Sequence, residues 1–238
     1  MKQTNAAKRL KPATKAKTKP RTGRRGRPSW SELQNRAETR EFLMQAVHEA
    51  MVEDASADFS LSEIAKRTGL SSTLVQYHFG GKEGLMIAQL ERASARAVEQ
   101  LRELAEADLP AVIKLRLHIG GLVNAAYRAP YLNRLVHALT HGKDRASARR
   151  VSELLVRPIA AFQKKLLEQG QREGIFRPIS PAQFYFIVTG ACDHMFWRRT
   201  ALADVFGIDV ITEELKRDYA RLITAMVLKG ISSQVAPR

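Results

Sequence analysis

Apolar residues recur at intervals of three or four positions along most of the chain after residue 32, which is the spacing of one face of an α-helix. The clearest stretch lies between residues 82 and 105, where the apolar positions are Met86, Leu90, Ala93, Ala97, Leu101 and Leu104. Alternating Val/Ile-rich runs and hairpin turn signals are missing. We therefore predict an all-α fold of about nine helices, at residues 33–54, 60–69, 71–78, 82–105, 110–127, 131–141, 146–170, from 180 onward, and 212–229. Pro158 is expected to kink the helix at 146–170, because proline has no backbone N–H.

Two short helices in the N-terminal part are joined by a tight turn. Ser60 and Glu63 have the spacing of a capping box at the start of the first helix, and Gly69 follows its last turn. Ser71 is placed to cap the second helix, which ends near His78. Two short helices with a glycine in the turn form a helix-turn-helix signature, in which the second helix enters the major groove of DNA.

The second short helix is rich in small polar side chains, as the segment LSSTLVQYHFGGKEGL (residues 70–85) shows. Short side chains let a helix backbone approach the base edges, and their hydroxyl and amide groups exchange hydrogen bonds there. The residues that meet both needs are Ser72, Thr73 and Gln76. The residues placed to contact phosphate oxygens are Tyr77, His78, Lys82 and the helix start at Ser60. The competing interpretation is a polar surface turn that packs Tyr77 and Phe79 inward.

The segment from Arg40 to Met51, followed by SLSEIAKRTGLSSTLVQYHFGGKEGL, resembles the DNA-binding region of the TetR family of bacterial transcriptional regulators. The resemblance covers about 50 residues, and the remainder agrees with the family in length and helical layout. It implies a homodimer whose C-terminal domain binds a small molecule and thereby loosens its hold on DNA. We include Arg40 and Ser71 among the residues expected to contact DNA.

This chain departs from the family pattern at two places. The loop EDASADFS has no glycine where the family usually carries one. Ser72 stands where a basic residue is common, and Gln76 where a bulkier apolar or aromatic residue is common. The bases that this chain prefers therefore do not follow from its resemblance to the family.

The net charge of +15 comes mostly from the N-terminus. Residues 1–31 hold eleven Lys or Arg and no Asp or Glu, whereas the remaining 207 residues carry 28 basic and 24 acidic side chains. Such an arm is expected to be disordered and to meet a polyanion such as nucleic acid. Its Arg25-Gly26-Arg27-Pro28 resembles the core of an AT-hook, in which Arg25 and Arg27 lie along a narrow minor groove. The alternative is a solvated linker that only screens phosphates.

We expect four parts: a disordered basic arm at 1–31, a helix-turn-helix domain at 32–81, a ligand-binding and dimerisation domain at 82–230, and a tail at 231–238. The last two predicted helices have long apolar faces, and Phe186 and Phe196 add apolar surface beside the first of them. We therefore expect a homodimer through these two helices. The alternative is that both faces are buried inside one subunit.

Aromatic, histidine and small polar residues recur on the predicted helices of the C-terminal half. A helical pocket with an apolar lining and a few polar groups would hold a small organic ligand, and the resemblance places an effector pocket in this half. The candidate residues are His118, Asn124, Tyr127, Tyr131, His137, Phe162, Tyr185, His194 and Trp197. The alternative is that they are ordinary core residues, which is the more common role of such side chains.

A metal site and a catalytic site are the alternatives to a ligand sensor in this half of the chain. His137 and His141 share a helix face and could chelate a metal, but the segment HALTH lacks the glutamate of the HExxH motif and no third ligand is identifiable. Cys192, Asp193 and His194 have the chemical types of a catalytic triad, but neighbours on a helix do not face one another. We therefore expect no metal, no cofactor and no enzymatic activity.

Cysteine content and hydropathy bear on the compartment. A single cysteine suits a reducing cytoplasm, the apolar runs are too short to span a membrane, and the N-terminus does not read as a secretory signal. We predict a cytoplasmic, ligand-responsive repressor that binds a palindromic operator in double-stranded DNA as a dimer. The alternative is a constitutive architectural DNA-binding protein that relies on the basic arm. An activator would share the parts of the repressor.

Overall fold

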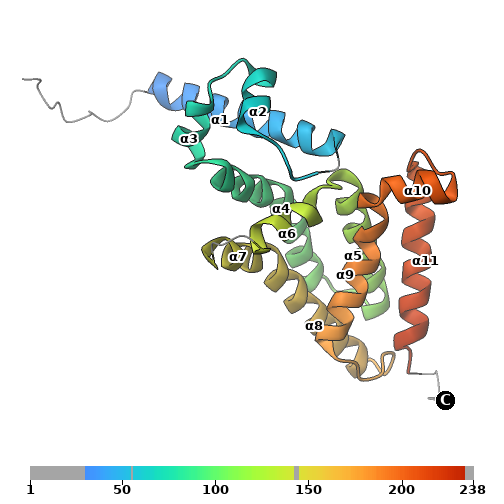
Figure 1. Ribbon diagram of the computed structural model, residues 1–238. Coiled ribbons are helices and arrows are strands. Elements are labelled where there is room, and N and C mark those ends of the chain that lie inside the picture. Colours follow the sequence, from blue (N-terminus) through green and yellow to red (C-terminus); the bar gives the residue numbers. More distant parts are fainter. Residues whose placement is uncertain (1–29, 55, 142–144, 234–238) are drawn as a thin grey trace, which may run out of the picture. The chain divides into compact units, whose positions relative to one another are not determined.

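Figure 1 shows the computed structural model of the protein, which describes residues 30–54, 56–141 and 145–233. These residues contain eleven α-helices and one π-helical segment. In chain order they are α1 (Trp30–Glu53), α2 (Leu61–Thr68), α3 (Ser72–Phe79), α4 (Lys82–Glu106), α5 (Ala111–Arg128), α6 (Leu132–His141), α7 (Arg145–Val151), η1 (Ser152–Val156), α8 (Arg157–Arg172), α9 (Pro181–Trp197), α10 (Arg199–Phe206) and α11 (Glu213–Ile231). Across the same ranges the only β-structure is an isolated bridge between Phe176 and Ser232. The predicted all-α fold is confirmed.

All nine predicted helices are present, and the structure adds one. The predicted helix at 146–170 is the continuous run of α7, η1 and α8, and α1 begins at Trp30, earlier than predicted. The unpredicted helix is α10, which follows α9 directly and ends at Gly207 with φ of +66°. The predicted basic arm, with Arg25 and Arg27, lies outside the described residues up to residue 29.

Contacts divide the chain into two units, residues 1–37 and residues 38–238. Of the first unit the structure describes residues 30–37, which form the beginning of α1. The second unit contains the rest of α1, every other helix and two hydrophobic cores.

The first core joins the helix-turn-helix to the helices that follow it. Its buried side chains come from α1 to α4, α6 and α7, and include Leu43, Val47, Ile64, Val75, Leu85, Leu90 and Leu135. Ion pairs at its edge tie the same helices together: Arg67 of α2 lies 2.6 Å from Glu53 of α1, and Arg92 of α4 lies 3.0 Å from Glu41 of α1. Helices α1, α2, α3 and the first half of α4 therefore pack as one body.

The second core lies among α5, α8, α9 and α11, and its buried side chains include Ile119, Phe162, Phe184, Val188, Phe196 and Ile223. Helix α4 reaches it through its second half, where Leu101 and Leu104 pack against the cluster. One continuous helix thus takes part in both cores, as its course in Figure 1 shows.

The helical run from Arg145 to Arg172 changes its hydrogen bonding just before the proline that was expected to kink it. In η1 the backbone N–H of Arg157 donates to the carbonyl of Ser152, five residues earlier, instead of four. Pro158 has no N–H to offer the carbonyl of Leu154, and a local π-turn is one way in which a helix accommodates such a loss. The hydrogen bonding is therefore irregular in the turn before Pro158, and the kink at Pro158 stays a prediction.

Candidate nucleic-acid interface and ligand-sized cavity

Local hydrogen bonds fix the ends of α2. The Ser60 hydroxyl accepts from the backbone N–H of Glu63 at 3.1 Å, and the Glu63 carboxylate accepts from the N–H of Ser60 at 2.7 Å. This is the predicted capping box, and it already uses two N–H groups of the helix start. At the other end Gly69 has φ of +68°, a left-handed conformation that turns the chain toward α3.

Helix α3 has one buried side and one exposed side. Val75 is 1% exposed and packs into the first core, together with half-buried Leu74 and Phe79. The residues on the exposed side are Ser72, Thr73, Gln76 and Tyr77, and Tyr77 is 51% exposed. Gln76 lies one helical turn after Ser72 and Thr73, so these side chains share a face. The three residues predicted to read bases are therefore brought together on the solvent side of the helix.

The residues predicted to contact DNA include Ser71 and His78, near the two ends of α3, and Arg40 on α1. The Ser71 side chain is exposed and makes no capping hydrogen bond, although Ser71 is the N-cap of α3. His78 is half-buried, with its ring edge-on to Tyr77 at 5.1 Å between centroids. Arg40 is exposed on α1, and its guanidinium lies 5.1 Å from the centre of the Phe79 ring.

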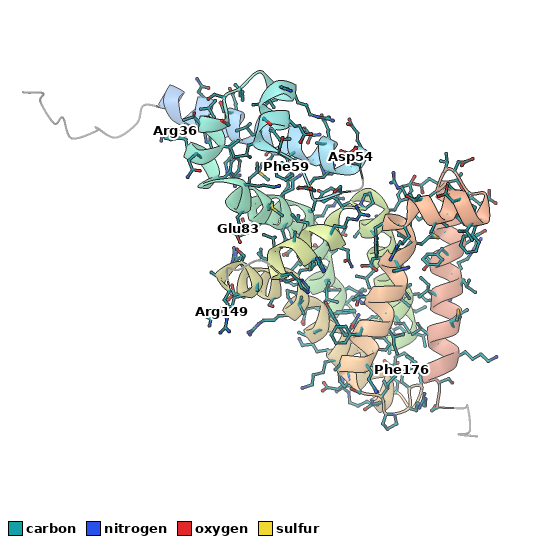
Figure 2. All side chains as sticks on the ribbon, viewed as in Figure 1. Arg36, Asp54, Phe59, Glu83, Arg149 and Phe176 are labelled. Carbon is teal, nitrogen blue, oxygen red and sulfur yellow. The ribbon has the colours of Figure 1, made fainter. Side chains whose placement is uncertain are left out.

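Lys82 begins α4 beside the same face. Its ammonium group lies 3.3 Å from the carboxylate of Asp58 and 4.9 Å from the centre of the Phe59 ring, which is labelled in Figure 2. The Asp58 side chain is 96% exposed, so this ion pair is solvated and weak. A phosphate could therefore replace Asp58 as the partner of Lys82.

Gly84 is a residue of this region that sequence reasoning missed. A Cβ atom at this position would lie 1.8 Å from the carbonyl oxygen of Phe79, the last residue of α3. Only glycine lets the first turn of α4 approach the end of α3 so closely. The glycine in the segment KEGL was the signal in the sequence, and the close contact with Phe79 explains why glycine is needed there.

A cavity of about 580 Å³ lies among α4, α5, α6, α9 and the region of η1 and α8. It is partly open to solvent, since Leu117 and Phe186 in its lining are 52% and 73% exposed. Most of its lining is apolar, with leucine, alanine, glycine and aromatic side chains. The polar residues in the lining are Ser94, Gln100, His118, Asn133, Tyr185, Thr189 and Asp193. The volume falls within the range of about 300–1,000 Å³ that is typical of small-molecule sites.

Three of the nine predicted ligand-contacting residues line this cavity: His118, Tyr185 and Trp197. The other six lie outside the lining: Asn124, Tyr127, Tyr131, His137, Phe162 and His194. Helix packing decides which side of a helix faces a cavity, and residue type alone did not reveal it.

The residues outside the lining have other partners. The Lys216 ammonium donates to Asn124 Oδ1 at 3.3 Å and lies 4.6 Å from the centre of the Tyr127 ring. Tyr131 is fully buried, and its hydroxyl lies 2.8 Å from Nδ1 of His48. These contacts connect α5 with α11 and the start of α6 with α1.

His118 is buried at the cavity wall. Its Nε2 lies 2.9 Å from the side-chain amide nitrogen of Gln163, and its ring packs on Phe162 with centroids 4.8 Å apart. Burial lowers the pKa of His118 to about 4. The imidazole is therefore neutral at pH 7, and it accepts the hydrogen bond that the amide nitrogen of Gln163 donates.

Cys192, Asp193 and His194 do not converge. Burial raises the pKa of the Cys192 thiol to about 12, so the thiol stays protonated. The Asp193 carboxylate accepts a hydrogen bond from the side chain of Asn133, and burial raises its pKa. His194 is exposed and lies edge-on to Trp197 at 5.1 Å. Each of the three side chains thus has a different principal environment or contact.

His137 and His141 stack on the exposed side of α6, with ring centroids 3.9 Å apart. Within the described ranges, no group of three or more His, Cys, Asp or Glu residues is arranged to hold a metal ion. The same ranges contain no helix that is long and apolar enough to cross a bilayer.

Residues 108–236 match a protein-family profile described as the tetracyclin repressor-like C-terminal domain. The chain belongs to the TetR family. The match covers the half of the chain that has no diagnostic motif, whereas the resemblance read from the sequence lies in the N-terminal half.

Curated relatives of this TetR-family chain are transcriptional regulators rather than enzymes. The HTH-type transcriptional regulator BetI of Stenotrophomonas maltophilia is 40% identical over 68 residues, which cover 29% of this chain and 31% of that protein. The HTH-type transcriptional repressor NicS of Pseudomonas putida is 22% identical over 201 residues, which cover 81% of this chain and 92% of that protein.

Solved structures share the fold. The fatty acid degradation regulator FadR of Bacillus halodurans has a TM-score of 0.60 at 15% identity, covering 80% of this chain and 98% of its own. FadR of Bacillus subtilis, solved in complex with stearoyl-CoA, has a TM-score of 0.56 at 16% identity, covering 78% of this chain and 97% of its own. At such identities the likeness establishes the fold.

Helices α9 and α11 of this TetR-family fold expose apolar side chains, and these are the two helices at which a dimer interface was expected. Phe186 and Ile187 on α9 are 73% and 61% exposed, and Leu222 and Met226 on α11 are 57% and 67% exposed. The expectation for Phe196 was wrong: it is 1% exposed, because it packs between Tyr127 and Tyr219 in the second core.

Proposed function

We propose that the protein is a ligand-responsive transcriptional repressor that binds a palindromic operator as a homodimer and is released by a small organic effector. Helix α3 is the recognition helix in this proposal, with Ser72, Thr73 and Gln76 on the base edges. Lys82, Arg40 and the other residues around α3 contact phosphates. Acting on DNA in this way places the protein in the cytoplasm.

The proposal rests on the position of helix α4, which contacts both α3 and the cavity. Its first residue, Lys82, lies beside the DNA-facing surface, and Gly84 holds its first turn against the end of α3. Its second half forms one wall of the cavity, through Ala93, Ala97, Leu101 and neighbouring residues. A ligand that displaces the second half of α4 therefore acts on the same rigid helix that positions α3.

Dimer geometry explains how such a displacement would change DNA affinity. Two recognition helices must lie about 34–36 Å apart, or a multiple of that distance, to enter successive major grooves. A ligand that prefers a conformer with another spacing shifts the population away from DNA by as much as its differential affinity allows. The exposed residues of α9 and α11, including Phe186 and Met226, are the surface through which we expect the second subunit to pack.

Selection from a randomised double-stranded DNA library tests the proposal. Purified full chain and a variant without residues 1–28 are each used to recover bound fragments. Recovery of one palindromic motif by both proteins is the expected result, because α3 reads the bases and the arm adds only non-specific affinity.

Other outcomes would overturn the proposal. Loss of all binding without the arm, or enrichment of A·T-rich DNA without a palindrome, would favour the architectural function, since the eleven basic residues of the arm would then be the main contact. A reporter gene downstream of the recovered motif gives the sign of regulation. Repression that is relieved by effector is expected, and activation would contradict the repressor assignment.

A further inference from the structure

The wall of the cavity holds few ionisable side chains. Asp193 is the one carboxylic acid among the described residues that line the cavity, and none of these is lysine or arginine. His118 is neutral there, because burial lowers its pKa to about 4. The Cys192 thiol also stays neutral, because burial raises its pKa to about 12. The charge that the lining of the cavity can carry is therefore the negative charge of Asp193.

The carboxylate of Asp193 is only partly compensated by the protein. Asn133 Nδ2 donates to its Oδ2, yet Asp193 takes part in none of the ion pairs that join the described side chains. Burial raises the pKa of Asp193, and the charge of neighbouring His194 offsets part of that effect. Asp193 is half-buried, and a carboxylate that loses part of its water is destabilised unless a cation lies beside it. A ligand is one source of that cation.

Aromatic rings line the cavity near the same carboxylate. Trp197 follows Asp193 by four residues on α9 and Tyr185 precedes it by eight, so the three share one side of the helix. Besides burial, the charge of Asp193 raises the pKa of Tyr185, which places the two groups within electrostatic reach. Aromatic faces attract alkylammonium groups, above all next to a negative charge.

We propose that the cavity binds an organic cation, with a protonated amine or quaternary ammonium group beside Asp193 and an apolar body along α4 and α5. This inference rests on the proposed function, because it names the chemical class of the effector. Leu101 of α4 and Leu117 and Leu122 of α5 form the apolar wall. The volume of about 580 Å³ accommodates a ligand of ordinary drug size.

An anionic amphiphile is the competing class. The guanidinium carbons of Arg134 and Arg198 lie 5.5 and 4.4 Å from the centre of the Trp197 ring, so an acid group could pair with them while its tail entered the cavity. Both arginines are exposed and neither lines the cavity. Solvent and salt screen their charges more strongly than they screen Asp193. The charge in the lining of the cavity therefore favours the cation.

Three probes with the same tail separate the two classes. Decyltrimethylammonium, decanol and decanoate are titrated into purified full-length protein by isothermal calorimetry without DNA. The expected order of affinity is ammonium, then alcohol, then carboxylate. Tightest binding by decanoate, equal affinity for all three, or no binding of the ammonium compound would overturn the inference, and none of these comparisons needs a variant.

Asp193→Asn then removes the charge and keeps the shape of the side chain. We expect ammonium affinity to fall roughly 10- to 100-fold, the scale of a lost charge-assisted contact, while decanol affinity stays the same. Asp204→Asn on exposed α10 is the matched control and should change neither. Circular dichroism confirms that the variants are folded. Unchanged ammonium affinity in folded Asp193→Asn would contradict the role of the carboxylate.

The same preparations keep the two proposals apart. An operator complex that forms normally, in a protein that does not bind the ammonium probe, rejects the ligand class and leaves the repressor function standing. Ammonium binding that depends on Asp193, in a protein that recovers no palindromic DNA, rejects the repressor function and leaves the cation site standing.

Discussion

The hydroxyl oxygen of Tyr131 lies 2.8 Å from Nδ1 of His48, and the two rings meet edge-on with centroids 5.6 Å apart. Burial lowers the pKa of His48 and raises that of Tyr131, so the hydrogen bond joins two neutral groups at pH 7. His48 belongs to α1, whereas Tyr131 is flanked in sequence by Pro130 and Leu132, which both line the cavity. This bond therefore joins a residue between two cavity-lining neighbours to the helix-turn-helix body.

Removing that hydroxyl should affect both stability and DNA affinity. Tyr131→Phe leaves His48 Nδ1 without its partner, and we expect a loss of about 1 kcal/mol in the free energy of unfolding, measured in urea. Operator affinity should fall as well, because α1 loses a fixed contact. Tyr219→Phe is the control, since the Tyr219 hydroxyl makes one comparable bond, to the carbonyl of Ala191 at 2.6 Å, far from α1. Equal losses of operator affinity in both variants would contradict a specific link.

The exposed polar face of α3 was predictable because its residues are close in sequence. Capping residues, a glycine in the turn and the contrast between Val75 and the polar residues around it are local signals, and a helix of known period converts them into faces. The bond between His48 and Tyr131 was not predictable, because it joins positions 83 residues apart. Only the packing of α6 on α1 and α4 brings them together.

The sequence predicted which half of the chain holds the cavity, but not which residues line it. Sequence reasoning chose aromatic and histidine side chains, whereas the cavity exists largely where side chains are small, as at Ala93, Ala97, Gly121 and Gly190. Ala93 and Ala97 were predicted on the apolar face of their helix, but their small size was not recognised as a signal of a cavity. Phe196 illustrates the opposite error, since an apolar residue beside the main stripe of its helix was assigned to the surface and is buried by Tyr219 of α11.

Stability should depend on pH through His118. In the unfolded chain a histidine takes up its proton near its ordinary pKa of 6.5, whereas in the folded protein burial holds the pKa of His118 at about 4. Between these values the unfolded state binds more protons, so this contribution to stability is lost as pH falls from 6.5 toward 4 and is constant below. The difference corresponds to about 3 kcal/mol.

Urea unfolding of the protein and of His118→Gln between pH 7 and pH 4 checks this effect. The variant should lose less stability over the interval, because its side chain takes up no proton. His141→Gln, at an exposed histidine, is the matched control. If the wild type and His118→Gln lost stability in parallel, His118 would not be the group responsible.

Gly84→Ala should disturb the junction of α3 and α4. The added Cβ would meet the backbone oxygen of Phe79, which cannot rotate away, so the two helices must separate. We expect a loss of about 1–3 kcal/mol in stability and a larger relative loss of operator affinity, because the recognition helix moves. Gly120→Ala in α5 is the control: no described atom lies within 4 Å of its added Cβ, so it should be neutral or stabilising by up to about 1 kcal/mol. Wild-type operator affinity in Gly84→Ala would show that the close contact does not position α3.

Replacing Gln76 by alanine and replacing Lys82 by alanine should weaken DNA binding in different ways. Gln76 is exposed on the face of α3 assigned to the base edges, so Gln76→Ala should cost about 1–3 kcal/mol on the preferred operator and relax discrimination at one base pair of each half-site. Lys82 lies beside that face, and its loss should weaken binding to all sequences alike.

Operator affinities measured from low to high salt separate the two effects. Each phosphate contact adds about 0.9 to the slope of log affinity against log salt. Lys82→Ala removes such a contact from each half-site and should reduce the slope, whereas Gln76→Ala should leave the slope unchanged. Gln171→Ala and Lys164→Ala, at exposed positions on α8, are the matched controls. A changed salt slope in Gln76→Ala, or relaxed base discrimination in Lys82→Ala, would reverse the two assignments. In that case the start of α4, rather than the exposed face of α3, would lie in the major groove.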